Sequence, residues 1–105
     1  MTYRVALSER AKNDLREIYT YIALNLFAPN SASKLLSRLK EAICSLNLFP
    51  EAYPVYEAVG FAEHRLRMMP VGRYRVFYLV DHKENSVYIV RVLFERQDVE
   101  KELKQ

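Results

Sequence analysis

The period of the hydrophobic positions changes twice along this chain. Apolar and polar residues alternate over residues 2–7, and this period of two predicts a β-strand. Over residues 11–26, and again over 32–46, apolar residues recur every three or four positions. That spacing places them on one face of a helix, so we expect two amphipathic helices after the first strand.

Local signals set the ends of the two helices. Ser8 and Ser31 stand where N-caps are needed, because a serine side chain can accept a hydrogen bond from an N–H of the first turn. Residues 28–30 (Ala-Pro-Asn) interrupt the first helical pattern and residues 49–50 (Phe-Pro) end the second, since proline cannot continue a helix. The short break predicts an antiparallel helical hairpin.

From residue 63 the period returns to two, after a stretch without a period that predicts a loop at residues 51–60. Short polar turns separate the alternating segments, which predicts an antiparallel three-strand meander. Its middle strand is apolar on both faces and should be central in the sheet. The expected elements are strands at 63–69, 74–80 and 87–94, turns at 70–73 and 81–86, and a short helix at 98–103 with Asp98 as its cap.

This order of elements predicts an α+β fold. An N-terminal strand precedes a two-helix antiparallel hairpin, which packs on an antiparallel sheet that the meander completes. With 105 residues, the chain should form a single domain over residues 1–105. The hairpin should bury its apolar stripes on one face of the sheet, which leaves the other face free for a partner or ligand.

Composition narrows the classes of function. The formal net charge is +3, a mild basic bias that permits a nucleic acid or an acidic protein as partner. The single cysteine, Cys44, excludes an intrachain disulfide, and we expect it to be a small buried apolar residue. No residues have metal-ligand spacing, so we expect no metal and no cofactor. No apolar run is long enough to cross a membrane, and the chain is expected to be cytoplasmic, without membrane contact.

Arginines are concentrated between residues 63 and 80, where four occur with a single acid. A guanidinium keeps its charge and offers a planar set of donors that suits phosphate oxygens. We expect several of the arginines to converge on one surface that binds a polyanion; the alternative is exposed strand residues paired with acids. Alternation places Arg65 and Arg67 on one strand face. The full set is Arg65, Arg67, Arg73, Arg75, Arg91 and Arg96.

Metal-independent RNA cleavage needs a base, a cation and an acid, and arginine suits only the cation. Tyr78 and Glu95 are the candidates for proton transfer, although Tyr78 fits the core better. His64 should face away from the strand arginines, so we interpret it as structural. His82 lies in a charged turn and is expected to be solvated.

Four segments of the chain carry a family resemblance. They read LSERAKNDLREIYTYIA, LLSRLKEAICSLNLFP, GRYRVFYLVD and YIVRVLFERQDVEKEL, and with the opening strand they cover nearly the whole chain. They resemble the RelE/ParE family of bacterial toxins, the toxin halves of type II toxin–antitoxin modules. The resemblance implies a toxin that arrests growth and a cognate antitoxin, encoded nearby, that wraps and neutralises it.

The family divides by target. RelE-like members cut mRNA in the ribosomal A site, which would make this chain a metal-independent endoribonuclease that acts on the ribosome with its mRNA. The resemblance carries the catalytic roles of that branch to Arg65, Arg67, Arg75 and Arg96. The C-terminal tyrosine or His-Tyr ending of such nucleases has no counterpart after Tyr88, so the catalytic set is partial.

ParE-like members bind DNA gyrase and block replication, and they need no nuclease site. Their last strand runs into a segment of the form Arg-Ile-Leu-His-x-Arg-x-Asp, and residues 91–98 fit this form with Phe94 in place of the histidine. This ending favours the ParE-like branch. Arg73 and Arg91 are the expected substrate-binding residues. A relative that only binds its antitoxin is the third alternative.

Overall fold

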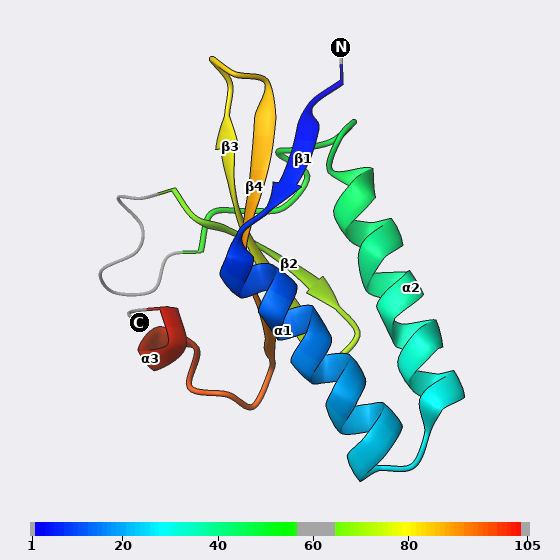
Figure 1. Ribbon diagram of the computed structural model, residues 1–105. Helices are drawn as coiled ribbons and strands as arrows, with labels where there is room; N and C mark the ends of the chain where they lie inside the picture. The colour runs from blue at the N-terminus through cyan, green and yellow to red at the C-terminus, as the bar shows by residue number, and fades with distance from the viewer. Residues whose placement is uncertain (1, 57–64, 104–105) are drawn as a thin grey trace.

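The computed structural model describes residues 2–56 and 65–103 of the chain (Figure 1). A strand leads into two helices, and three consecutive strands and a short helix follow, so the α+β fold expected from the sequence is confirmed. The elements are β1 (Arg4–Leu7), α1 (Glu9–Thr20), the π-helix η1 (Tyr21–Asn25), α2 (Pro29–Ser45), β2 (Arg67–Val71), β3 (Tyr74–Asp81), β4 (Ser86–Phe94) and α3 (Val99–Leu103).

The four strands form one sheet in the order β1-β4-β3-β2. β2, β3 and β4 pair in antiparallel fashion, so the predicted meander is confirmed, and β3 is a central strand as expected. β1 pairs in parallel with β4, and this pairing ends with Leu7 opposite Ile89. The register between β3 and β4 shifts at Phe77 and Tyr78, where β4 carries one extra residue.

Ser8 caps α1 as predicted, because its Oγ accepts a hydrogen bond from the backbone N–H of Ala11 at 3.0 Å. The helix then changes to a π-helical turn, η1, before the hairpin reverses. The prediction that Ser31 caps the second helix is wrong, because α2 begins at Pro29 with Ala28 as its N-cap residue. Proline suits the first helical position, where its φ is already helical and its missing N–H has no partner to lose.

Two apolar cores lie on the two faces of the sheet. The larger one joins α1 and α2 to strand residues such as Val76 and Ile89, which are fully buried. On the opposite face, Phe77 and Leu93 are buried in a cluster with Val99 of α3, the short helix drawn apart from the hairpin in Figure 1. The expectation that this face is free is therefore wrong at its centre, because α3 covers apolar side chains there.

The turn between β2 and β3 comes later and is shorter than the pattern predicts. Pro70, expected in the turn, pairs with Arg75 inside the strand, and the turn shortens to two residues that begin with Gly72. Gly72 has a φ of +57°, a conformation that suits glycine because it has no Cβ. The start of the predicted strand and His64 fall within residues 57–64, outside the described residues.

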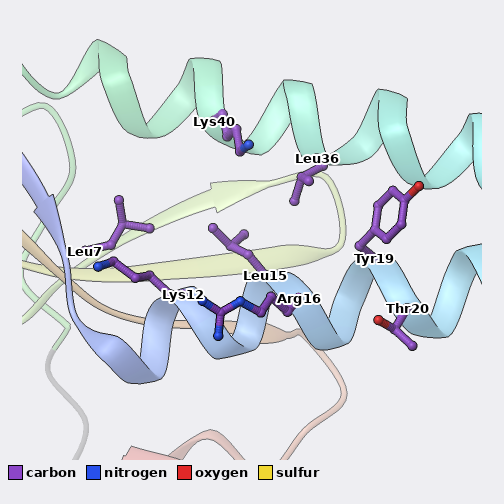
Figure 2. A pocket seen from close by; sticks show the side chains of 8 residues that line it. All are labelled: Leu7, Lys12, Leu15, Arg16, Tyr19, Thr20, Leu36 and Lys40. Atoms are coloured by element: carbon purple, nitrogen blue, oxygen red, sulfur yellow. The ribbon is translucent and has the colours of Figure 1, made fainter.

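The helical hairpin carries a groove between α1 and α2, and Figure 2 shows the side chains that line it. Cys44 is exposed, so the expectation that it is buried is wrong; it lies beside the buried stripe that includes Ile43 and Leu46. Over residues 2–56 and 65–103, no helix combines the length and apolar character that crossing a bilayer requires.

Candidate functional site

Arg67 lies on the helix-covered face of the sheet. Its cross-strand partner is Tyr78, which is fully buried in the core on that face. The guanidinium donates hydrogen bonds to the backbone oxygen of Tyr53 and, at 3.2 Å, to the carboxylate of Glu51. Because the side chain is only 13% exposed, Arg67 serves to hold the segment that connects α2 to β2.

His82 joins the same network from the turn between β3 and β4. Its Nδ1 lies 2.6 Å from the hydroxyl of Tyr3, and its Nε2 lies 3.3 Å from a carboxylate oxygen of Glu51. The side chain is exposed, as predicted, yet both ring nitrogens have protein partners. A general base needs a nitrogen within reach of substrate, so this arrangement favours a structural role for His82.

Arg75 lies on the opposite face of the sheet from Arg67. Arg75 alternates along β3 with Val76, whose side chain is buried on the helix-covered face. The sheet therefore separates these two arginines. Arg65 is exposed in a turn before β2 and has a φ of +55°. Because it lies outside the strand, the alternation expected to place it on the same face as Arg67 does not apply to it.

Three of the candidate arginines do lie at one end of the sheet, where β3 begins and β4 has ended: Arg73, Arg75 and Arg96. Arg73 and Arg96 are exposed, and Arg75 is partly buried. Arg73 forms an ion pair with Glu95 at 3.5 Å and accepts a backbone hydrogen bond from the same residue. This end of the sheet is the place where the described residues come nearest to the expected basic surface.

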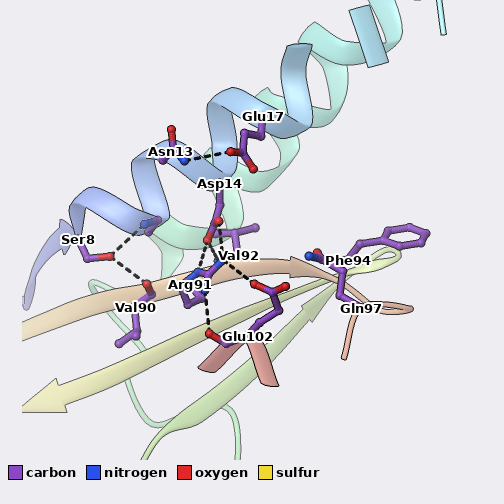
Figure 3. A network of polar contacts seen from close by, with 11 residues as sticks. Ser8, Asn13, Asp14, Glu17, Val90, Arg91, Val92, Phe94, Gln97 and Glu102 are labelled. Atoms are coloured by element: carbon purple, nitrogen blue, oxygen red, sulfur yellow. Dashed lines mark hydrogen bonds and ion pairs between the residues drawn. The ribbon is translucent and has the colours of Figure 1, made fainter. Parts of the chain in front are cut away.

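Arg91 is buried between α1 and α3 (Figure 3). Its Nε and Nη2 donate to the two carboxylate oxygens of Asp14 at 2.8 and 2.9 Å, and its Nη1 donates to the backbone oxygen of Glu102 at 3.0 Å. The hydrogen bonds to Asp14 are the largest of the effects that raise the pKa of Arg91. Arg91 therefore joins three elements, and its expected contact with a substrate stays a prediction.

The short strand β1 pairs with only part of β4, and residues at the start of α1 form hydrogen bonds with the next backbone groups of β4. Beyond Leu7, Ser8 donates its backbone N–H to the oxygen of Ile89 and its hydroxyl to the oxygen of Val90. Six residues after Ser8, Asp14 accepts a hydrogen bond from the backbone N–H of Val92 at 2.9 Å. The carboxylate thus satisfies both an edge N–H and the Arg91 guanidinium.

Asp14 is not among the site residues expected from the sequence, because charged residues of an amphipathic helix usually lie on its polar side. The signal was nevertheless present. Asp14 follows Ala11 by three positions and precedes Ile18 by four, and this spacing places it on the buried stripe. A carboxylate on an apolar stripe indicates a buried partner, because burying an unpaired charge is costly.

A cleft of about 620 Å³ opens beside this ion pair. Its lining combines aromatic rings with carboxylates: Tyr21, Tyr74, Phe94, Glu17, Glu102 and Asp14, with Arg91 and Gln97 among the other residues. Burial, and to a smaller extent the neighbouring Tyr21, raises the pKa of Tyr74. Since Asp14 and Glu102 engage the Arg91 guanidinium, the cleft presents aromatic surface and holds no free cation for a phosphate among its lining residues.

Of the two proton-transfer candidates, only Glu95 lies at the end of the sheet that carries Arg73, Arg75 and Arg96. Tyr78 is fully buried, as expected, and burial raises its pKa. Glu95 is paired with Arg73. Within residues 2–56 and 65–103, no three His, Cys, Asp or Glu side chains are grouped so that they could hold a metal ion. The catalytic roles carried over to Arg65, Arg67, Arg75 and Arg96 therefore stay predictions.

The N-terminal strand, the helical hairpin and the meander form the architecture that the resemblance to small α+β toxins implies. A family model described as the ParE toxin of the type II toxin–antitoxin system, parDE, matches residues 5–99. The chain belongs to this family, and the resemblance to RelE/ParE toxins is confirmed. Among proteins of curated function, no sequence gives a significant match.

Solved structures share the fold at low sequence identity. A chain of the chromosomal ParDE toxin–antitoxin system from Pseudomonas aeruginosa superposes with a TM-score of 0.68 at 18% identity, covering 88% of this chain and 95% of that one. The toxin–antitoxin complex RelBE2 from Mycobacterium tuberculosis gives 0.63 at 19% identity, covering 90% and 99%. The archaeal RelE–RelB complex from Pyrococcus horikoshii gives 0.62 at 21% identity, covering 92% and 99%. ParE-type and RelE-type structures thus have the same fold as this chain.

Proposed function

We propose that this chain arrests growth as a ParE-like toxin that binds and inhibits DNA gyrase. The dispersal of its arginines carries the proposal. Arg67 and Arg75 lie on opposite faces of the sheet, and Arg91 is buried against Asp14. An inhibitor that acts by binding needs an exposed surface and no assembled nuclease site, and the match to the ParE toxin family supports the same branch.

A cognate antitoxin neutralises the toxin in this proposal. Structures with the same fold from M. tuberculosis and P. horikoshii are complexes of a toxin with its antitoxin. The tip of the helical hairpin here exposes large apolar side chains, which is typical of a surface that binds another protein. They are Tyr21, Leu24, Leu26 and Phe27, with exposed fractions between 54 and 88%.

A RelE-like, ribosome-dependent mRNA endonuclease is the second candidate. The observation in its favour is the position of Arg73, Arg75 and Arg96 at one end of the sheet. Two of these guanidinium groups are exposed, and together they could contact a phosphate backbone. The third candidate, a relative that only binds its antitoxin, predicts no growth arrest at all.

A supercoiling assay tests the proposal directly. The purified chain is incubated with DNA gyrase, relaxed plasmid and ATP, and the topoisomers are resolved on a gel. We expect loss of supercoiling that depends on toxin concentration. In parallel, primer extension on transcripts after a pulse of expression reports mRNA cleavage, and we expect intact transcripts together with induced DNA-damage signalling.

The outcomes separate the three candidates. Full supercoiling at saturating toxin, with cuts at codon boundaries in the transcripts, would reject gyrase inhibition in favour of the nuclease. Normal growth with neither effect would support the relative that only binds its antitoxin. Heat-denatured toxin is the control for nonspecific inhibition of the gyrase reaction.

A further inference from the structure

The cleft beside the Asp14–Arg91 pair carries more negative than positive charge. Three carboxylates line it, those of Asp14, Glu17 and Glu102, and Arg91 is the one cation among its described lining residues. Asp14 matches the charge of Arg91 through hydrogen bonds of 2.8 and 2.9 Å. Two carboxylates therefore have no cation of their own, in a chain whose formal net charge is +3.

Glu17 and Glu102 are the two carboxylates in excess. They come from α1 and α3, as Figure 3 shows, and neither is buried. Glu17 accepts a hydrogen bond from the uncharged amide of Asn13 at 3.1 Å. Glu102 reaches Arg91 with one oxygen only, at 3.5 Å. Within the described chain, each carboxylate thus keeps a second oxygen that accepts no hydrogen bond and is available to a ligand.

Three aromatic rings form the rest of the opening. Tyr21 is 57% exposed, and neither Tyr74 nor Phe94 is fully buried. The rings of Tyr74 and Phe94 meet edge to face, with centroids 5.4 Å apart. An aromatic face attracts a cation, and a guanidinium can also stack on it because it is planar and weakly hydrated.

We propose that this cleft binds one arginine side chain of a partner protein. The guanidinium lies against the aromatic rings and donates hydrogen bonds to the free oxygens of Glu17 and Glu102. A lysine ammonium fits less well, because it is strongly hydrated and has no plane to stack. The volume of about 620 Å³ is within the roughly 300–1,000 Å³ of ordinary ligand sites.

The surface next to the cleft indicates a protein as the source of the arginine. Tyr21 also begins the exposed apolar tip of the hairpin, and Leu24, three positions later, is 67% exposed. Apolar residues beside the arginine in a partner segment can cover Leu24, whereas a small guanidinium compound would leave it in water. The inference goes beyond gyrase inhibition, because it concerns which side chain the cleft accepts and not which protein supplies it.

A titration of the ¹⁵N-labelled full chain, followed by two-dimensional NMR, tests the inference. The probe is a short synthetic peptide with one arginine between leucines. Matched peptides carry lysine or citrulline in its place, and citrulline has nearly the shape of arginine without its charge. Acetyl-arginine amide represents a small-molecule source. We expect the arginine peptide to shift the amide signals of Tyr21 and Phe94, and the citrulline peptide to bind about tenfold more weakly or worse.

Two double variants with the same change in charge locate the binding site. Glu17→Gln with Glu102→Gln alters the cleft, and Glu9→Gln with Glu41→Gln alters exposed acids that do not line it. We expect the cleft variant to bind the arginine peptide about tenfold more weakly than the control variant, which should match the wild type. Tyr21→Leu should weaken binding about threefold by removing one ring. Thermal unfolding checks that every variant folds.

Several outcomes would overturn the inference. They are no binding of the arginine peptide, equal binding of the arginine and citrulline peptides, or equal loss of affinity in the two double variants. Equal affinity for the lysine peptide would reject recognition of a planar guanidinium. Acetyl-arginine amide that binds as tightly as the peptide would reject a protein segment as the ligand. The titration contains no gyrase, so each of these results leaves the proposed function to its own assay.

Discussion

Asp14 and Arg91 lie 77 positions apart in the sequence and form a buried ion pair between α1 and β4 with two hydrogen bonds. Their side chains are only 7 and 8% exposed. Asp14 also accepts the backbone N–H of Val92, so a single carboxylate satisfies three donors. The pair lies where β1 no longer covers the edge of β4, and it thereby fixes the position of α1 on the sheet.

Asp14→Ala is expected to lower the free energy of unfolding by about 3–5 kcal/mol, which is typical when one partner of a buried ion pair is removed. The substitution leaves the charge of Arg91 without its principal partner and the N–H of Val92 without an acceptor. Urea denaturation at neutral pH measures the change.

Glu9→Ala is the matched control, because it removes an exposed ion pair with Lys12 on the same helix and should leave the urea midpoint unchanged. A double variant, Asp14→Leu with Arg91→Met, should recover part of the lost stability, since it removes both charges together. Asp14→Ala with the stability of Glu9→Ala would show that the buried pair does not stabilise the fold.

The two serines at the predicted helix starts should respond differently to substitution. Ser8→Ala is expected to cost about 1–2 kcal/mol, because Ser8 caps α1 and also donates its hydroxyl to the oxygen of Val90. Ser31→Ala should be nearly neutral, because Ser31 lies inside α2, after Pro29. Thermal unfolding of the two variants measures the difference. Equal losses at both sites would contradict the capping geometry.

Much of the fold is predictable because local periodicity reflects burial. The apolar residues on both faces of Tyr74–Asp81 identify a central strand, and the stripe that includes Leu39 and Ile43 identifies a buried helix face. The start of α2 differs from the prediction, because a serine can cap a helix wherever one begins, whereas Pro29 sets this particular start. The parallel pairing of β1 depends on how the hairpin crosses the sheet, and no local pattern records that.

The arrangement of the candidate site was much less predictable. Alternation orders side chains only within a strand, so it could not apply to Arg65, which lies in a turn. It also could not reveal that Glu51, from the segment after α2, meets both Arg67 and His82. Contacts of this kind join residues far apart in the sequence, and they depend on the tertiary packing of irregular segments.

The buried hydroxyl of Tyr78 should make stability depend on alkaline pH. Burial raises the pKa of Tyr78 above the ordinary value of 10.0, although the charge of Arg67 opposes this effect. The folded protein therefore holds this proton at a pH where the unfolded chain releases it. The resulting stabilisation is complete below the unfolded pKa and is lost as the pH rises through the folded pKa.

Tyr78→Phe should consequently show a shallower loss of stability above about pH 10 than the wild type. Urea denaturation at a series of pH values from neutral to alkaline measures the two slopes. Tyr88→Phe is the matched control, because Tyr88 is 43% exposed, and it should follow the wild-type slope. Parallel curves for Tyr78→Phe and the wild type would mean that this hydroxyl does not titrate differently on unfolding.

Arg75→Ala separates the two toxin mechanisms in living cells. If the chain inhibits gyrase by binding, the variant should arrest growth as strongly as the wild type, because inhibition by binding needs no catalytic cation and Arg75 is partly buried. If the chain is a nuclease, the loss of a catalytic cation should abolish the arrest. Growth after induction is followed together with the amount of soluble protein.

Arg10→Ala, which changes an exposed arginine on α1, is the control for a general loss of positive charge. Gyrase inhibition would be contradicted if cells with soluble Arg75→Ala protein grow normally while cells with Arg10→Ala protein arrest. That result would favour the RelE-like mechanism, in which Arg75 is catalytic.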